Sequence, residues 1–174
     1  AQCGCKDYML NAFFREIEDL LRGIALVREY SPRSNDYLSG FGERMSCRVI
    51  ADYFTRLGMR AEAYDIFDLG FITDDKFGAA RPIKGWEKNF HAEFDRLVPK
   101  NTVPIITGFI GKTPAGDLTT VGRNGSDFSA TLVASALEAE ECEIWTDTDG
   151  VMTADPSLIP QAKSIPFMSF AEAS

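Results

Sequence analysis

The sequence predicts an α/β domain with a mainly parallel central sheet. Amphipathic helical segments alternate along the chain with short apolar strands, an order that is typical of parallel sheets covered by helices. The stretch VPIITGFIG, residues 103–111, is nearly all apolar, as expected for a strand buried on both faces.

The first half of the chain contains two predicted helices and one strand. Apolar residues recur with helical period from Asp7 to about Glu29, and the following Ser31-Pro32 pair is expected to end that helix. A second helix is predicted over 43–57, with Gly58 as its left-handed cap. Residues 60–66 alternate in polarity and predict a strand.

The second half adds further elements of both kinds. Residues 67–85 are rich in glycine and aspartate and form either an active-site flap or a surface excursion of the sheet. A helix is predicted over 87–97, and a hairpin turn at 114–117 follows the apolar strand. A helix over 127–137 then leads to a second buried strand at 143–146.

Composition excludes several classes of protein. The 174 residues suffice for one domain with a hydrophobic core, and the net charge of −8 argues against nucleic acid as a partner. No apolar run approaches the roughly 18 residues of a membrane span. Four cysteines and one histidine make a structural zinc site improbable and favour reduced thiols in the cytoplasm. We expect Cys47 and Cys142 in small core positions and His91 at the surface.

The turn at residues 122–127, GRNGSD, is the most informative polar segment. Ser126 or Asp127 can cap the helix that follows, a role that requires no function. Capping does not explain Arg123, whose guanidinium beside a helix N-terminus suits a carboxylate or phosphate. An acidic residue at the same place suits an ammonium group, so a zwitterionic amino acid satisfies both.

Three other acidic residues have alternative interpretations. Asp147 and Asp149 follow the predicted strand at 143–146 and form either an Asx-type turn or a contact to nucleotide and Mg²⁺. Glu43 is either a helix N-terminal residue favoured by the helix dipole or a ligand for a substrate ammonium group. Ligands of open α/β sheets bind where such strand ends and helix N-termini converge.

Taken together, these motifs resemble those of the aspartokinases, members of the amino-acid kinase superfamily. The most specific are TTVGRNGSDFSATLVASAL at 119–137 and EIWTDTDGVMTADP at 143–156, supported by GFGERMS at 40–46 and VPIITGFIG. They occur in the family's order and span most of the chain.

The resemblance implies a three-layer α/β sandwich with a largely parallel sheet, here a partial amino-acid kinase catalytic domain over residues 1–174. It implies transfer of the γ-phosphoryl group of Mg-ATP to the side-chain carboxylate of L-aspartate. This reaction begins lysine, threonine and methionine biosynthesis. The family also implies a cytoplasmic homodimer.

The resemblance further implies roles for individual residues. Glu43 matches the acidic residue that holds the substrate amino group, and Arg123 matches the arginine that pairs with the substrate α-carboxylate. Asp127 matches an aspartate important for catalysis. Three further residues match the lining of the aspartate pocket: Phe109, Gly125 and Ser126. Three match positions at or beside the nucleotide: Thr146, Asp147 and Asp155.

The sequence departs from the family pattern at several points. It lacks the Lys-Phe-Gly-Gly-Thr phosphate loop of aspartokinases, and Ser157 and Met152 stand where an arginine and a tyrosine are common. We expect the chain to be a piece of a longer protein, poorly active by itself and without the regulatory ACT domains. Alternative interpretations are a glutamate or acetylglutamate kinase, or an inactive truncated copy.

Overall fold

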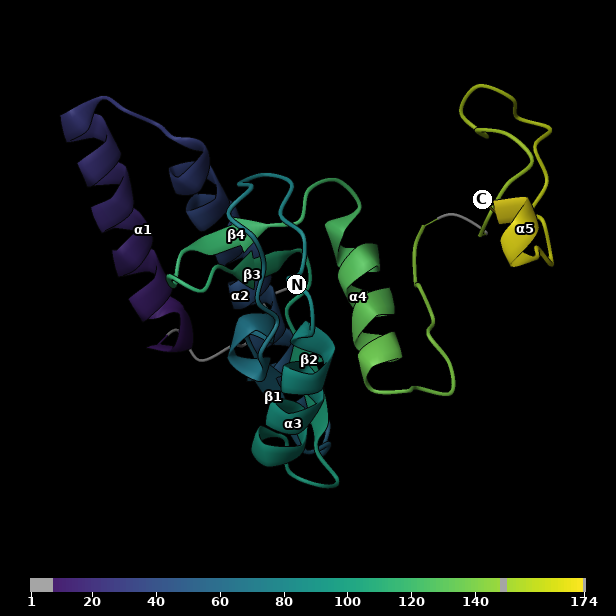
Figure 1. Cartoon of the computed structure of the whole chain (residues 1–174), viewed down its shortest axis with the longest axis horizontal. Coiled ribbons are helices and arrows are strands. Elements are labelled where there is room, and N and C mark those ends of the chain that lie inside the picture. Colours follow the sequence, from purple (N-terminus) through teal and green to yellow (C-terminus); the bar gives the residue numbers. More distant parts are fainter. Residues whose placement is uncertain (1–7, 148–149, 174) are drawn as a thin grey trace. The chain divides into compact units, whose positions relative to one another are not determined.

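The structure is a computed structural model that describes residues 8–147 and 150–173. Contacts divide the chain into two units, residues 1–142 and residues 143–174, and each is described by itself (Figure 1). Among its described residues, 8–142, the first unit contains four long helices and two small sheets, which confirms the α/β class.

Two helices open the first unit, and the second starts earlier than the sequence suggests. Helix α1 spans Tyr8–Val27, and α2 spans Pro32–Arg56 instead of beginning at Glu43. The Ser31-Pro32 pair begins α2: the Ser31 hydroxyl accepts a hydrogen bond from the Ser34 N–H at 3.2 Å, and proline suits the first helical position. Gly58, with φ of 87°, follows the helix end as predicted.

Gly40 lies inside α2 and allows the helix to approach a strand closely. A Cβ atom at Gly40 would lie 2.9 Å from the Leu118 side chain, so a larger residue would require the buried Leu118 side chain to move. The two interior glycines of α2, Gly40 and Gly42, made this segment resemble a loop in the sequence, although packing keeps it helical.

The strands form two separate pairs. Strands β1, Ala61–Tyr64, and β2, Val103–Ile106, are parallel, with Ala61 opposite Val103. Strands β3, Ile110–Lys112, and β4, Leu118–Thr120, are antiparallel and are joined by the predicted hairpin turn. We call the β3–β4 pair the smaller sheet. The parallel pairing is therefore confirmed for β1 and β2. Helix α2 packs against both pairs.

The predicted strand over 103–111 is divided in two. Strand β2 ends at Ile106, and β3 begins at Ile110 in the other sheet. Between them Phe109 has φ of 64°, a left-handed conformation that no regular strand contains. After β2 ends, the Thr107 hydroxyl accepts a hydrogen bond from the Ile66 N–H at 2.9 Å, so a side chain replaces the strand's backbone as the acceptor.

Residues 67–85, predicted as an active-site flap or a surface excursion, extend the sheet of β3 and β4. After the 3-10 helix η1, Ile66–Leu69, Ile72 bridges to Lys112 and the Ala80 N–H donates to the Thr120 carbonyl at 2.9 Å. The segment is therefore attached to the sheet, and it is not confined to the surface, because Phe71, Thr73 and Ala80 are fully buried.

Helices α3, Trp86–Leu97, and α4, Gly125–Ala136, agree closely with their predictions and contact each other. The core of the unit combines η1, the loop after it, α3 and the smaller sheet. Its buried residues are Ile66, Phe67, Leu69, Phe71, Trp86, Phe90, Ile110, Leu118 and Val121.

The second unit contains no strand over 143–146 within its described residues, so that prediction is wrong. A strand requires a partner backbone, and the segment is irregular, with Trp145 89% exposed. The unit contains an antiparallel bridge between Met152 and Ser164 and the short helix α5, Phe170–Ala173.

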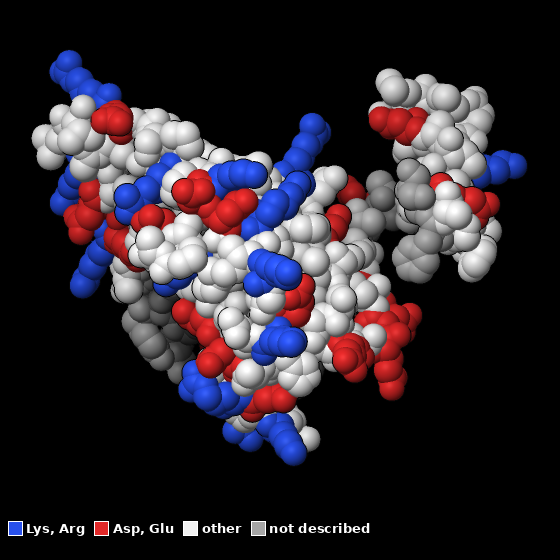
Figure 2. All heavy atoms as spheres, in the orientation of Figure 1, with Lys and Arg blue, Asp and Glu red and all other residues white. Residues whose placement is uncertain are grey.

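Surface and cysteine positions complete the fold. Cys47 is buried as predicted, but Cys142 is exposed, while Cys3 and Cys5 lie outside the described residues. His91 is at the surface, as expected. None of the helices among the described residues has the length and apolarity needed to cross a bilayer. On the face drawn in Figure 2, basic and acidic side chains are interspersed.

We expect Phe71→Ala to destabilise the first unit by about 3–5 kcal/mol, because the ring is fully buried and packs edge-on against Trp86 at 4.8 Å. Urea unfolding measures the change. Leu26→Ala is the control, since Leu26 is 84% exposed and its loss should change stability by less than about 0.5 kcal/mol. Equal effects of the two substitutions would contradict the assigned core.

Candidate functional site

The turn between β4 and α4 lines a cavity of about 370 Å³. Glu43 from α2 and Phe109 from the β2–β3 connection complete its wall. The structure therefore brings together every residue that the resemblance assigns to catalysis or to the aspartate pocket. The lining residues are Glu43, Phe109, Gly122, Arg123, Asn124, Gly125, Ser126 and Asp127.

The start of α4 presents its first backbone N–H groups without a side-chain cap. Asn124 is the N-cap residue, with φ of 56° and no capping hydrogen bond from its side chain. The prediction that Ser126 or Asp127 caps the helix is wrong, because both lie inside its first turn. The first N–H groups of a helix have no acceptor within the helix, and they favour an anion.

Gly125 is required at this position by close packing. A Cβ atom there would lie 2.7 Å from the Phe109 ring and 2.8 Å from the Val121 side chain. Gly122, with φ of 85°, has a second constraint, because its Cβ would lie 2.9 Å from the Gly78 carbonyl oxygen. The glycines of the motif therefore hold the turn against the loop and the β2–β3 connection.

Phe109 has an unfavourable backbone conformation at the edge of the cavity. Its φ is 64°. The Ile110 N–H donates to the Gly108 carbonyl at 2.6 Å, which closes a three-residue turn with Phe109 at its centre. Neighbours on both sides hold this conformation: the Phe109 N–H donates to the Ser129 hydroxyl at 3.0 Å, and its carbonyl accepts from the Val121 N–H at 2.9 Å. Such strain persists where surrounding contacts fix it, often at ligand sites.

Glu43 lies in the middle of α2, so the prediction of a helix N-terminal role is wrong. Its carboxylate accepts a long hydrogen bond from the Ser126 hydroxyl at 3.5 Å, which joins α2 to α4 across the cavity. Burial raises the pKa of Glu43 above its usual 4.5, while hydrogen bonds from the Gly108 backbone and Ser126 act in the opposite direction.

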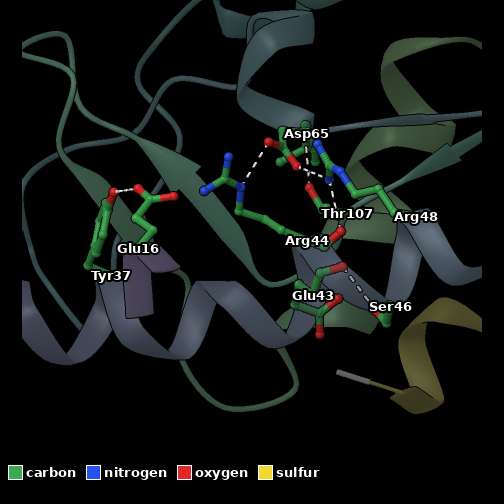
Figure 3. Close-up of polar contacts among 9 residues, drawn as sticks. Glu16, Tyr37, Glu43, Arg44, Ser46, Arg48, Asp65 and Thr107 are labelled. Carbon is green, nitrogen blue, oxygen red and sulfur yellow. Dashed lines mark hydrogen bonds and ion pairs between the residues drawn. The ribbon is translucent and has the colours of Figure 1, made fainter. Parts of the chain in front are cut away.

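The neighbouring residue Arg44 extends toward Asp65, in a different direction from Glu43, and belongs to a separate ion cluster (Figure 3). Arg44 and Arg48 donate to the buried Asp65 carboxylate at 2.9 and 2.5 Å, and both guanidinium groups lie over the Phe13 ring. This cluster fixes α2 against α1 and the end of β1, and so fixes the direction in which Glu43 points.

Sequence reasoning missed Arg81, which lies beside the cavity turn. Its guanidinium donates to the Val121 carbonyl at 3.3 Å and lies 5.2 Å from the Phe128 ring centre. It also missed Asp36, which is buried beneath the same turn. Asp36 and Glu43 are seven residues apart, about two helical turns, and this spacing is the sequence signal that would have placed both on one side of a helix.

The three predicted nucleotide residues lie in the second unit. Thr146 and Asp147 are exposed, with the threonine hydroxyl 3.3 Å from the carboxylate. Asp155 accepts hydrogen bonds from the Ser157 N–H at 2.8 Å and its hydroxyl at 2.6 Å, and these bonds lower the pKa of Asp155. Asp149 lies outside the described residues.

The described part of the chain contains no group of three or more His, Cys, Asp or Glu side chains placed to hold a metal ion. Mg²⁺ in nucleotide sites is commonly held by one or two carboxylates together with phosphate oxygens. Asp147 and Asp155 are carboxylates of that kind, so the residues present suit Mg²⁺ that arrives with a nucleotide.

The arrangement in the cavity suits a small zwitterion. Arg123 and the uncapped N-terminus of α4 provide positive charge and hydrogen-bond donors, and Glu43 and Asp127 provide negative charge. A free amino acid carries both a carboxylate and an ammonium group within a few bonds.

Several curated proteins are similar to this chain. Aspartokinase 1, chloroplastic, of Arabidopsis thaliana is 41% identical over 92% of this chain and 29% of its own length. The aspartokinase of Schizosaccharomyces pombe is 36% identical over 98% of this chain and 33% of its own length. Lysine-sensitive aspartokinase 3 of Escherichia coli is 37% identical over 94% of this chain and 37% of its own length.

A solved structure and a family model add to these similarities. The crystal structure of E. coli aspartokinase III in complex with aspartate and ADP matches with a TM-score of 0.73 at 32% identity, over 89% of this chain and 36% of that chain. The chain thus spans about a third of the length of its relatives. The model of the amino acid kinase family matches residues 10–174, and the chain belongs to that family.

Proposed function

We propose that the protein to which this chain contributes is an aspartate kinase, which transfers the γ-phosphoryl group of ATP to the side-chain carboxylate of L-aspartate. The observation that supports this most is the cavity in which Glu43, Arg123 and the start of α4 lie together. The similarity to aspartokinases, one of them solved with aspartate and ADP, supports the same substrates.

In this proposal the cavity binds the amino-acid end of the substrate. Arg123 and the N–H groups of the first turn of α4 hold the α-carboxylate, and Glu43 holds the ammonium group. Phe109, Gly125 and Ser126 form the wall that limits the size of the side chain.

The reaction requires positioning more than proton transfer. The aspartate side-chain carboxylate is already ionised near neutral pH, so one of its oxygens attacks the γ-phosphorus as the bond to the β,γ-bridging oxygen breaks and ADP leaves. The main barrier is the approach of two anions, which oriented binding and charge stabilisation reduce. Asp127 lies at the cavity where it can help to orient the reacting group.

The nucleotide is proposed to bind at the segment that contains Thr146, Asp147 and Asp155. Mg²⁺ bound with ATP supplies positive charge to the phosphates. Asp147 and Asp155 are the residues of this chain that would contact the metal and its phosphates.

The proposal includes a cytoplasmic homodimer active in the biosynthesis of lysine, threonine and methionine. Three Arabidopsis relatives are named chloroplastic, so fractionation of the source cells is the direct test of location. Sedimentation of the full-length gene product tests the dimer.

We expect the full-length gene product to form an acyl phosphate from ATP with L-aspartate, trapped as a hydroxamate, and not with L-glutamate or N-acetylglutamate. Acetylation removes the ammonium charge, and glutamate has one more methylene, so neither should suit the cavity beside Glu43. Preferential phosphorylation of either competitor would overturn the choice of substrate. Absence of binding to all three and to Mg-ATP in calorimetry would indicate an inactive copy.

We expect Arg123→Ala to raise the KM for aspartate about 100-fold, because it removes the charged partner of the α-carboxylate, and to leave the KM for ATP nearly unchanged. Steady-state kinetics of the full-length gene product measures both. Arg22→Ala is the matched control, since Arg22 lies on α1 and makes only exposed ion pairs. An unchanged KM for aspartate in Arg123→Ala would contradict the assignment.

We expect aspartate affinity to fall on acidification, because protonated Glu43 cannot pair with an ammonium group. The fall should begin at a higher pH than the usual glutamate pKa of 4.5 would give, since burial raises the pKa of Glu43. Calorimetric titrations between pH 8 and 4.5 measure this. Glu43→Gln should bind aspartate weakly at every pH in that range and lose most of the dependence.

Unfolding does not explain this expected loss of affinity. A raised folded-state pKa means that Glu43 contributes stability below pH 4.5 and loses that contribution as the pH rises through the folded value. The contribution of Glu43 to stability therefore increases while affinity falls. A wild-type affinity that does not change across this pH range would contradict the proposed role.

A further inference from the structure

Asp36 is a buried acidic residue that the proposed reaction does not use. Its side chain is fully inaccessible, and its carboxylate accepts three hydrogen bonds from neutral donors. The Gly78 N–H and the Thr120 N–H both donate to one oxygen at 2.8 Å, and the Thr120 hydroxyl donates to the other at 2.9 Å. A buried carboxylate is costly unless such donors satisfy it, so this contact constrains all three of its participants.

The three participants belong to three separate elements. Asp36 is on α2, Gly78 is in the loop that extends the smaller sheet, and Thr120 is the last residue of β4. The loop and β4 also contact each other, since the Ala80 N–H donates to the Thr120 carbonyl. Asp36 thus holds the loop and the end of β4 against one face of α2.

The cavity turn begins immediately after Thr120 and touches the same loop twice. Arg81 donates to the Val121 carbonyl, and Gly122 lies against the Gly78 carbonyl so closely that a Cβ would be 2.9 Å away. Arg123 is the next residue. The position of the Arg123 backbone therefore depends on the loop and on β4, both of which Asp36 holds.

Asp36 and Glu43 lie two helical turns apart on α2, so they point to the same side of the helix. Helix α2 consequently carries Glu43 itself and also fixes, through Asp36, the turn that carries Arg123.

We propose that Asp36 is a positioning residue for the substrate site, acting through Thr120 and Gly78 on the turn that carries Arg123. The effect on substrate rests on the proposed function, whereas the effect on the turn does not. Asparagine can keep both backbone contacts through its amide oxygen and can donate from its NH₂ group to the Thr120 hydroxyl, so alanine is the substitution that removes all three contacts.

Neighbouring threonines of β4 provide a matched pair for the test. Thr120→Val removes one donor to Asp36 with little change of shape. Thr119→Val removes a buried hydrogen bond on the opposite face of the same strand, where the Thr119 and Thr73 hydroxyls are 2.6 Å apart. Both substitutions lose one buried hydrogen bond, and only the first contacts Asp36.

Hydrogen–deuterium exchange of the ligand-free full-length gene product gives the first measurement. We expect the amides of Thr120 and Val121, which donate to Asp36 and to the Phe109 carbonyl, to exchange about tenfold faster in Thr120→Val and at the wild-type rate in Thr119→Val. Asp36→Ala, which removes all three contacts, should show the same change more strongly. Equal exchange in the two threonine variants would overturn the proposed contact route.

Steady-state kinetics gives the second measurement. We expect Thr120→Val to raise the KM for aspartate about tenfold with little change in the KM for ATP, and Thr119→Val to leave both nearly unchanged. Faster exchange with an unchanged aspartate KM would overturn the link between Asp36 and the substrate. A wild-type protein inactive with aspartate would instead refute the proposed function, and exchange alone would decide the role of Asp36.

Discussion

The close approach of α2 to the smaller sheet is the constraint on which the first unit depends. Gly40 permits it, because a side chain there would meet Leu118, and Asp36 fixes it through hydrogen bonds to Thr120 and Gly78. These contacts exist only because α2 begins at Pro32. A helix that began at Glu43 would present neither Asp36 nor Gly40 to β4, and the cavity turn would lose its support.

Local sequence signals predicted the helices α1, α3 and α4 well, since their apolar residues recur with a clear helical period. They did not predict the start of α2. The Ser31-Pro32 pair can end one helix or begin the next, and the bias of a residue before proline against the α conformation favoured the first interpretation. Helix α2 packs at Gly40 against Leu118, 78 residues away in the chain, and a local sequence pattern cannot show such a contact.

Strand predictions were less accurate, because a strand depends on a partner that its own residues do not specify. The apolar run 103–111 turns at Phe109 into a second sheet, and the apolar residues Ile144 and Trp145 lie exposed in an irregular segment. The residues of the cavity were identifiable because the motif 122–127 keeps most of them adjacent in sequence. Asp36 and Arg81 were not identifiable, since their relation to that motif arises only from tertiary contacts.

The cavity combines groups that could otherwise neutralise one another, and the fold keeps them apart. Glu43 lies on α2 and accepts a hydrogen bond from the Ser126 hydroxyl. Arg123 lies in the turn that glycine contacts and Arg81 hold in place. The two charges come from different elements, Glu43 from α2 and Arg123 from the turn before α4, and among the described residues the structure has no ion pair between them. A ligand that carries both a carboxylate and an ammonium group can satisfy the two charges together, which is why the proposed substrate is a free amino acid.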